Sequence, residues 1–178
     1  MGAAQTRQLL DLLDRSCQLN YLNLSEVDVI NVPSTALARA IIKVETVVFE
    51  ELKIKCNQIE EIFTASLTVV SKMKHLHMIG MNKDMSEVDA EVFAEAVNKL
   101  ESVAFDALDE DLIVEMFNVM SRGTNLKIFG MPDNQIAVDA FDYILEVDPE
   151  VLAKALNNLE WSLSDLILEV VVTMTSAV

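Results

Sequence analysis

The residues with the clearest chemical potential are two histidines, His75 and His77, which are the only histidines in the chain. On a strand, side chains two positions apart point to the same face, so both imidazoles could bind one metal ion. Two ligands are too few for a structural zinc site, and the neighbouring strands offer only Glu50 and Asp106 at diagonal positions. The ligand count therefore favours a pair of exposed histidines that titrate near neutral pH over a metal site.

The other reactive residues form no catalytic pattern. The sequence contains no serine-centred elbow, no glycine-rich phosphate loop and no HExxH motif. Cys17 and Cys56 lie far apart, at positions where buried apolar residues are expected. Free thiols in a reducing compartment are the simpler account, and one disulfide stays an alternative. We therefore expect no enzyme and no cofactor.

The charge of the chain bears on its partners. The 178 residues include 29 Asp and Glu against 13 Lys and Arg, which gives a net charge of −16. Such a surface repels phosphate backbones, so we expect no nucleic-acid partner. It attracts basic partners and speeds their encounter. The alternative is that the charge only maintains solubility.

Neither end of the chain has the features of a targeting or membrane segment. The stretch Met1–Arg7 lacks the apolar core of a signal peptide, and it matches a myristoylation pattern only in part. The apolar run Leu163–Val178 contains two acidic residues and is too short to span a bilayer. We expect a cytoplasmic protein with no membrane contact.

The elements that position these residues follow from an internal repeat. The segment Val32–Leu52 aligns without gaps to Val88–Leu108, and Val147–Leu166 aligns to both with one residue missing. Each copy has a helical half, in which apolar residues recur at helical spacing. In the second copy this half covers Ala90–Lys99 and places Val92, Phe93, Ala96 and Val97 on one face.

The other half of each unit has the pattern apolar-x-x-apolar-x-apolar, as in Leu19-x-x-Leu22-x-Leu24. Its last two apolar residues are two positions apart, so both side chains point to the same side of a strand. The pattern predicts strands near residues 19–25, 44–50, 73–79, 100–106, 126–132 and 159–164.

This pattern resembles leucine-rich repeats of the ribonuclease-inhibitor-like subtype, over nearly the whole chain from about Leu9. The similarity is most evident in Met73–Val103, which reads MKHLHMIGMNKDMSEVDAEVFAEAVNKLESV. It implies one α/β solenoid domain over residues 1–178, a right-handed horseshoe arc of about six repeats. A parallel sheet would line the concave face and helices the convex face. The chain departs from the family where an asparagine often follows each strand, because only Asn134 occupies that place.

The resemblance also implies a function, namely a non-enzymatic module that binds a protein or peptide on a concave face. Because that face is expected to be acidic, its charge favours a basic partner. The side chains expected on that face are Tyr21, Asn23, Thr46, Glu50, His75, His77, Ser102, Asp106, Ile128 and Trp161.

Several alternatives stay open. These positions could be ordinary solvated residues, with binding on a helix or loop face. The chain could also be a structural or regulatory segment of a longer repeat array with no partner of its own. Because neither end of the array shows a polar cap, we also expect self-association through the ends.

Overall fold

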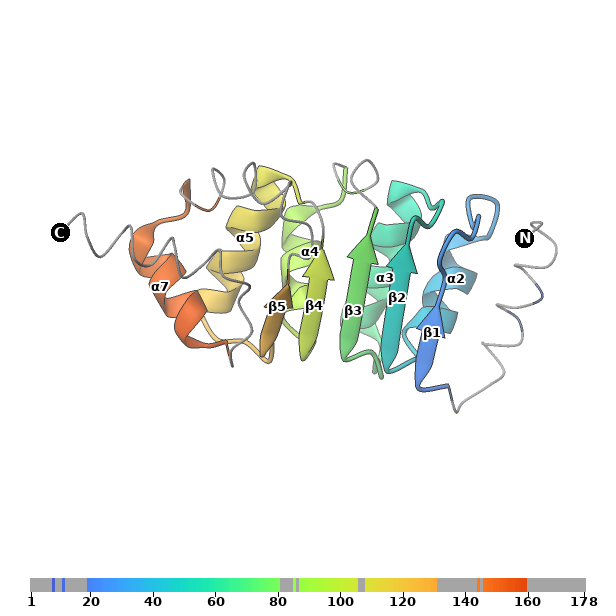
Figure 1. The fold of residues 1–178 in the computed structure, drawn as a ribbon, viewed down its shortest axis with the longest axis horizontal. Helices are drawn as coiled ribbons and strands as arrows, with labels where there is room; N and C mark the ends of the chain where they lie inside the picture. Colours follow the sequence, from blue (N-terminus) through green and yellow to red (C-terminus); the bar gives the residue numbers. More distant parts are fainter. Residues whose placement is uncertain are drawn as a thin grey trace.

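The computed structural model describes Gln8, Asp11 and residues 19–80, 85, 87–105, 108–130, 144 and 146–159. Within these residues, strands and helices alternate along the chain (Figure 1). The strands are β1 (Tyr21–Asn23), β2 (Thr46–Glu50), β3 (His75–Ile79), β4 (Ser102–Phe105) and β5 (Ile128–Gly130). The helices are α2 (Ser34–Ile41), α3 (Cys56–Thr68), α4 (Ala90–Val97), α5 (Glu110–Ser121) and α7 (Pro149–Asn157).

The strands form one parallel sheet in the order β1-β2-β3-β4-β5, so neighbours in the sequence are neighbours in space. The helices lie on one face of this sheet (Figure 1), and each helix contacts the next one along the chain. We call the opposite face of the sheet the open face. The expected α/β fold with a parallel sheet and repeating units is confirmed.

The strands form where the apolar pattern predicts them, although they are shorter than predicted. Side chains alternate along each strand, and one ladder of buried residues runs across the sheet toward the helices. This ladder consists of Leu22, Val47, Leu76, Val103 and Phe129, which are paired in register. The first apolar residue of each motif precedes its strand, because it packs into the core from the turn that enters the sheet.

Some predictions fall outside the described residues. Of the predicted strand at 159–164, only Leu159 is described, and the segment Gln135–Leu145 is described only at Ile144. Cys17 is also outside them, whereas Cys56 is half-buried at the first residue of α3.

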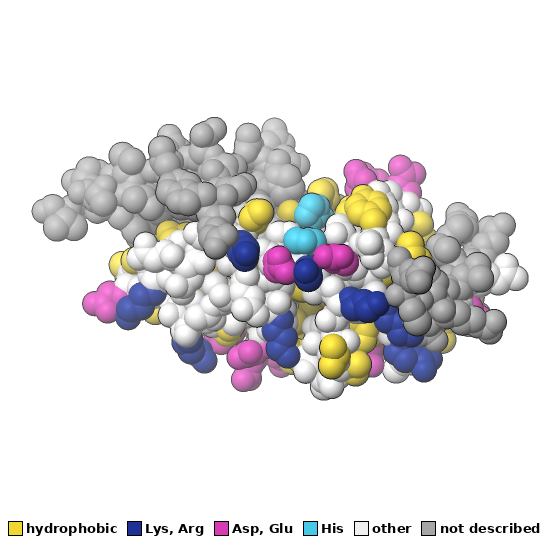
Figure 2. Space-filling view, turned by 90° about the horizontal axis from the view of Figure 1, so that it is seen from below, with side chains coloured by type: hydrophobic (Ala, Val, Ile, Leu, Met, Phe, Trp, Pro, Cys, Tyr) yellow, Lys and Arg dark blue, Asp and Glu magenta, His cyan; other side chains and the backbone are white. Residues whose placement is uncertain are grey.

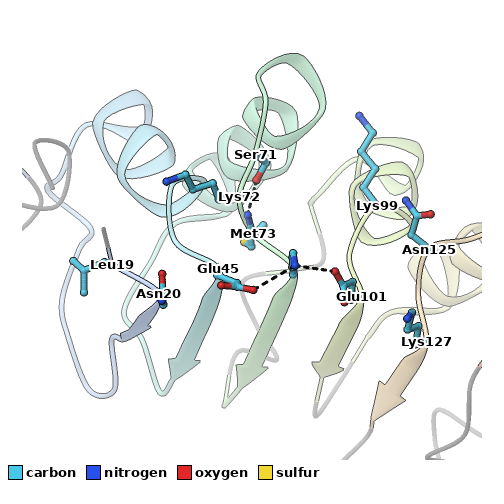
Figure 3. A pocket seen from close by; sticks show the side chains of 11 residues that line it. Leu19, Asn20, Glu45, Ser71, Lys72, Met73, Lys99, Glu101, Asn125 and Lys127 are labelled. Carbon is cyan, nitrogen blue, oxygen red and sulfur yellow. Dashed lines mark hydrogen bonds and ion pairs between the residues drawn. The ribbon is translucent and has the colours of Figure 1, made fainter. Parts of the chain in front are cut away.

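A row of charged residues lies immediately before the strands. Figure 2 views the molecule from the edge at which the strands begin, which we call the amino edge. Here the Lys74 ammonium lies 3.4 Å from Glu45 and 3.2 Å from Glu101 (Figure 3). The two carboxylates raise the pKa of Lys74 above its ordinary value, through hydrogen bonds and charge attraction. The contacts link the starts of three adjacent strands.

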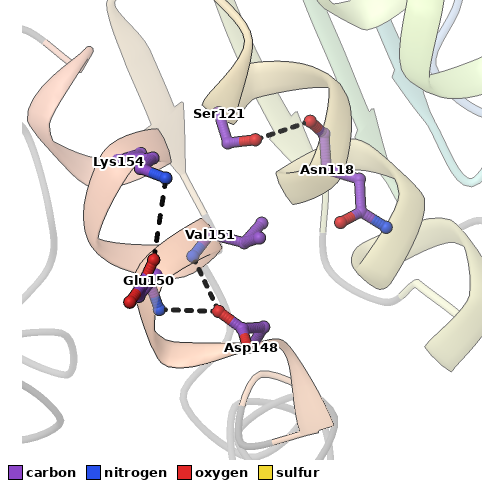
Figure 4. A network of polar contacts seen from close by, with 6 residues as sticks. All are labelled: Asn118, Ser121, Asp148, Glu150, Val151 and Lys154. Atoms are coloured by element: carbon purple, nitrogen blue, oxygen red, sulfur yellow. Dashed lines mark hydrogen bonds and ion pairs between the residues drawn. The ribbon is translucent and has the colours of Figure 1, made fainter.

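The helix ends follow simple capping chemistry. The Asp148 carboxylate accepts hydrogen bonds from the backbone N–H groups of Glu150 (2.8 Å) and Val151 (3.2 Å), and Pro149 follows it (Figure 4). Asp89 caps α4 in the same way, through the N–H of Val92. These carboxylates satisfy backbone donors that have no partner within the helix.

Helix α4 differs in one detail from the expected apolar face. Its buried residues are Phe93, Ala94, Ala96 and Val97, whereas Val92 is half-buried. Ala94 is buried instead of Val92. Helix α4 packs between α3 and α5, so its buried residues face both neighbouring helices.

Candidate binding surfaces

The structure brings five of the residues expected on the binding face into one row across the open face. In successive strands of the sheet, Tyr21 pairs with Thr46, then His75, Ser102 and Ile128. At the usual strand spacing, the row extends over roughly 19 Å. Its two ends are apolar and accessible, since Tyr21 is 55% and Ile128 is 42% exposed.

A second row lies two residues further along the strands and includes Asn23 and His77. Beyond it, Glu50 is exposed at the end of β2. The Ser25 hydroxyl donates to the Glu50 carboxylate at 2.9 Å, and the Ser25 N–H donates to the Asn23 side chain at 2.8 Å. This network holds Asn23 and Glu50 in place. Asp106 and Trp161 lie outside the described residues.

Ser102 is less accessible than the sequence suggests, with only 8% of its surface exposed. Its hydroxyl lies 2.7 Å from Nδ1 of His75 on the neighbouring strand. The hydrogen bond fixes the orientation of the His75 ring and uses the polar group of Ser102. In this row His75, rather than Ser102, therefore offers a polar atom to a partner.

His75 and His77 share the open face as expected, but both are half-buried rather than exposed. Burial lowers the pKa of His77 below its ordinary value of 6.5, and repulsion from His75 lowers it further. Among the described residues, no three His, Cys, Asp or Glu side chains are placed so that together they could hold a metal ion.

The lowered pKa of His77 gives a prediction. Above pH 6.5 the ring is neutral in both states, whereas below it the unfolded chain binds a proton before the folded protein does. Acidification from about pH 7 should therefore cost stability, and His77→Gln should remove that part of the loss. Nuclear magnetic resonance titration of the ring should give a midpoint below 6.5; a higher midpoint would refute the assignment.

The described part of the open face carries little charge. Among its described strand residues, Glu50 is the only acidic one and the histidines are the only basic ones. The carboxylates gather instead at the opposite edge from the row of Lys74, where the strands end and the helices begin. We call this edge the carboxyl edge. The acidic sheet face stays a prediction, because Asp106 lies outside the described residues.

A groove of about 650 Å³ lies at the carboxyl edge, between the first turns of α4 and α5. Its described lining contains two apolar residues, Ala90 and Val114, and six carboxylates: Asp89, Glu91, Glu110, Asp111, Glu115 and Glu146. We call it the acidic groove. The sequence contains a signal for it in the run Asp109–Asp111, whose charges also suit the positive end of helix α5. The residues at the start of α4 that line the groove come beside those of α5 only because neighbouring units stack.

Among the described residues, no helix combines the length and the apolar character needed to cross a membrane. Comparisons with models of protein families, with curated proteins and with solved structures found no match for this chain.

Proposed function

We propose that this protein is a leucine-rich-repeat horseshoe that binds a protein or peptide on its open sheet face and catalyses no reaction. The main support is the in-register row from Tyr21 to Ile128 on the face opposite the helices. In a repeat fold of this kind, the sheet would form the concave side of the arc and present a wide, continuous surface.

The chemistry of the row favours a partner held by mixed apolar and polar contacts. Tyrosine is enriched among residues that dominate interface energies, and Tyr21 offers both a ring and a hydroxyl. Ile128 provides an apolar contact at the far end, and His75 a hydrogen-bonding ring between them. The net charge of −16 would attract a basic partner and speed its approach, and Glu50 is the acidic residue among the described strand residues of the open face.

The proposal is tested with the partner captured from lysate, identified by mass spectrometry and then purified. Changing Tyr21 and Ile128 together to alanine should weaken the measured affinity by about 30-fold or more, because both ends of the row lose their anchors. Calorimetric titration gives the dissociation constant. Thr35→Ala and Thr64→Ala, exposed on α2 and α3, are the matched controls and should bind like the wild type.

Unchanged affinity in the Tyr21 and Ile128 variant would refute binding on the open face. If no protein is captured at all, the alternative is a structural segment of a longer repeat array, without a partner of its own.

A further inference from the structure

A short turn at the amino edge projects from the surface between α3 and β3. Its tip contains Val69 and Val70, which are 57% and 95% exposed. The base of the turn is fixed: the Ser71 hydroxyl donates to the Ile42 carbonyl at 3.2 Å, and the Lys72 N–H donates to the same carbonyl at 2.7 Å. An apolar tip on a rigid base loses little entropy when it binds.

Lysines flank this tip. Lys72 lies two residues after Val70, and Lys99 comes from the next turn along the edge, where its ammonium lies 3.3 Å from the Leu67 carbonyl. Both line a groove of about 560 Å³ together with Lys74 and Lys127 (Figure 3). We call Val69, Val70, Lys72 and Lys99 the basic knob.

Lysines outnumber carboxylates at this edge, although they have contacts within the chain. Lys99 bonds the Leu67 carbonyl in the last turn of α3, where a helix C-terminus favours a cation, and Lys74 pairs with two glutamates. The groove lining contains four lysines against these two carboxylates, in a chain with a net charge of −16. This local excess of positive charge favours an anionic partner.

The acidic groove has the complementary chemistry and lies on the opposite edge of the same molecule. Its half-buried residues Ala90 and Val114 suit an apolar tip, and its carboxylates suit flanking ammonium groups. Among the carboxylates of the groove, Glu115 pairs with Arg122 at 3.7 Å. The described residues that line the acidic groove include no lysine or arginine.

We propose that the basic knob of one copy of this chain inserts into the acidic groove of a second copy. Val70 then packs on Ala90 and Val114, while Lys72 and Lys99 meet the surrounding carboxylates. Since each copy carries a knob on one edge and a groove on the other, the contact is head-to-tail and can extend into open chains or rings. At physiological salt the screening length is about 8 Å, so distant like charges repel weakly while charges in contact still attract.

This contact uses neither the open face nor the ends of the array, so it can be tested separately from the proposed function. The knob variant is Lys72→Glu with Lys99→Glu, and the groove variant is Glu110→Lys with Asp111→Lys. Because Glu110 and Asp111 lie in the first turn of α5, a milder pair, Glu110→Gln with Asp111→Asn, is used if the reversed variant melts early.

Sedimentation velocity in salt of about 0.15 M should show the wild type associating as its concentration rises. Each variant alone should associate at least about tenfold more weakly. An equimolar mixture of the two variants should associate again, because the intact knob meets the intact groove and the reversed charges of the other two surfaces also attract one another. Matched controls reverse exposed charges elsewhere, with Lys53→Glu and Lys154→Glu in one variant and Glu26→Lys and Glu51→Lys in another. Both should associate like the wild type.

Several results would overturn the proposal: a wild type that stays monomeric, variants that associate normally, or a mixture that stays monomeric. Association that persists in both variants and in high salt would indicate the apolar ends instead. Binding of the wild type to vesicles of anionic phospholipid, lost in the knob variant and without self-association, would assign the knob to a lipid surface. The Tyr21 and Ile128 variant should associate like the wild type, whatever its effect on partner binding.

Discussion

Replacing Phe93 by alanine is expected to lower the free energy of unfolding by about 4 kcal/mol, as is typical for a phenylalanine removed from a packed core. Phe93 is fully buried and lies between two other rings. Its ring centroid is 5.4 Å from that of Phe63, edge-on, and 5.4 Å from that of Phe105. These three rings join α3, α4 and β4, so the cavity would weaken the contact between adjacent units.

Urea denaturation followed by circular dichroism measures this loss. Phe93→Leu keeps most of the volume and should cost about 1.5 kcal/mol or less. Val92→Ala on the same helix is a further control, because Val92 is only half-buried and should cost less than Phe93→Ala. A loss below about 1 kcal/mol for Phe93→Ala would contradict the central place of this cluster in the core.

Replacing Gln58 by alanine should cost about 3 kcal/mol, although a glutamine is seldom important for stability. Its side chain is 2% exposed and donates to the carbonyls of Val29 (2.8 Å) and Val32 (2.6 Å). Its carbonyl accepts from the Lys55 N–H at 2.9 Å, at the start of α3. Without it, buried backbone groups of two neighbouring units would lose their partners.

Thermal and urea melts of Gln58→Ala test this, with exposed Asn57→Ala as the control on the preceding residue. The control should change stability by about 0.5 kcal/mol or less. Equal stability of the two variants would show that water replaces the Gln58 amide, and the assigned role would then be wrong.

Gln58 also bears on the turns at which the resemblance to leucine-rich repeats predicts an asparagine. At two of those positions the chain has Leu52 and Leu108, which are buried in the core. The turns are joined instead by backbone bonds, such as Lys53 N–H to the Val27 carbonyl and Val29 N–H to the Lys53 carbonyl. Backbone pairing and one buried amide thus satisfy groups that an asparagine side chain could otherwise bind.

The sequence was sufficient to place the five described strands and helix α4, because the apolar residues that form the core also define the repeat. Because side chains alternate between the two faces of a strand, each motif also predicted which strand residues share the open face. The register of the sheet places five of these residues side by side. Strand boundaries were less predictable, because an apolar residue such as Val44 or Met73 packs equally well in a turn before the strand.

Other features depend on contacts between residues that lie far apart in the sequence. Ser102 is buried and hydrogen-bonded to His75, and Gln58 bonds carbonyls in the preceding unit. Composition gave the net charge but not its distribution. The helices run antiparallel to the strands, so all helix starts lie at one edge of the sheet and all strand starts at the other. This arrangement separates the acidic groove from the lysine-rich amino edge.

The most direct test of the central claim, binding on the open face, is photo-crosslinking from defined positions in native lysate. A photoreactive phenylalanine derivative replaces Tyr21, Ile128 or, for comparison, the exposed Ala153 on α7. We predict that positions 21 and 128 crosslink the same protein and that position 153 does not. Crosslinks from position 153 alone, or none from positions 21 and 128 to a protein that the wild type captures, would contradict it.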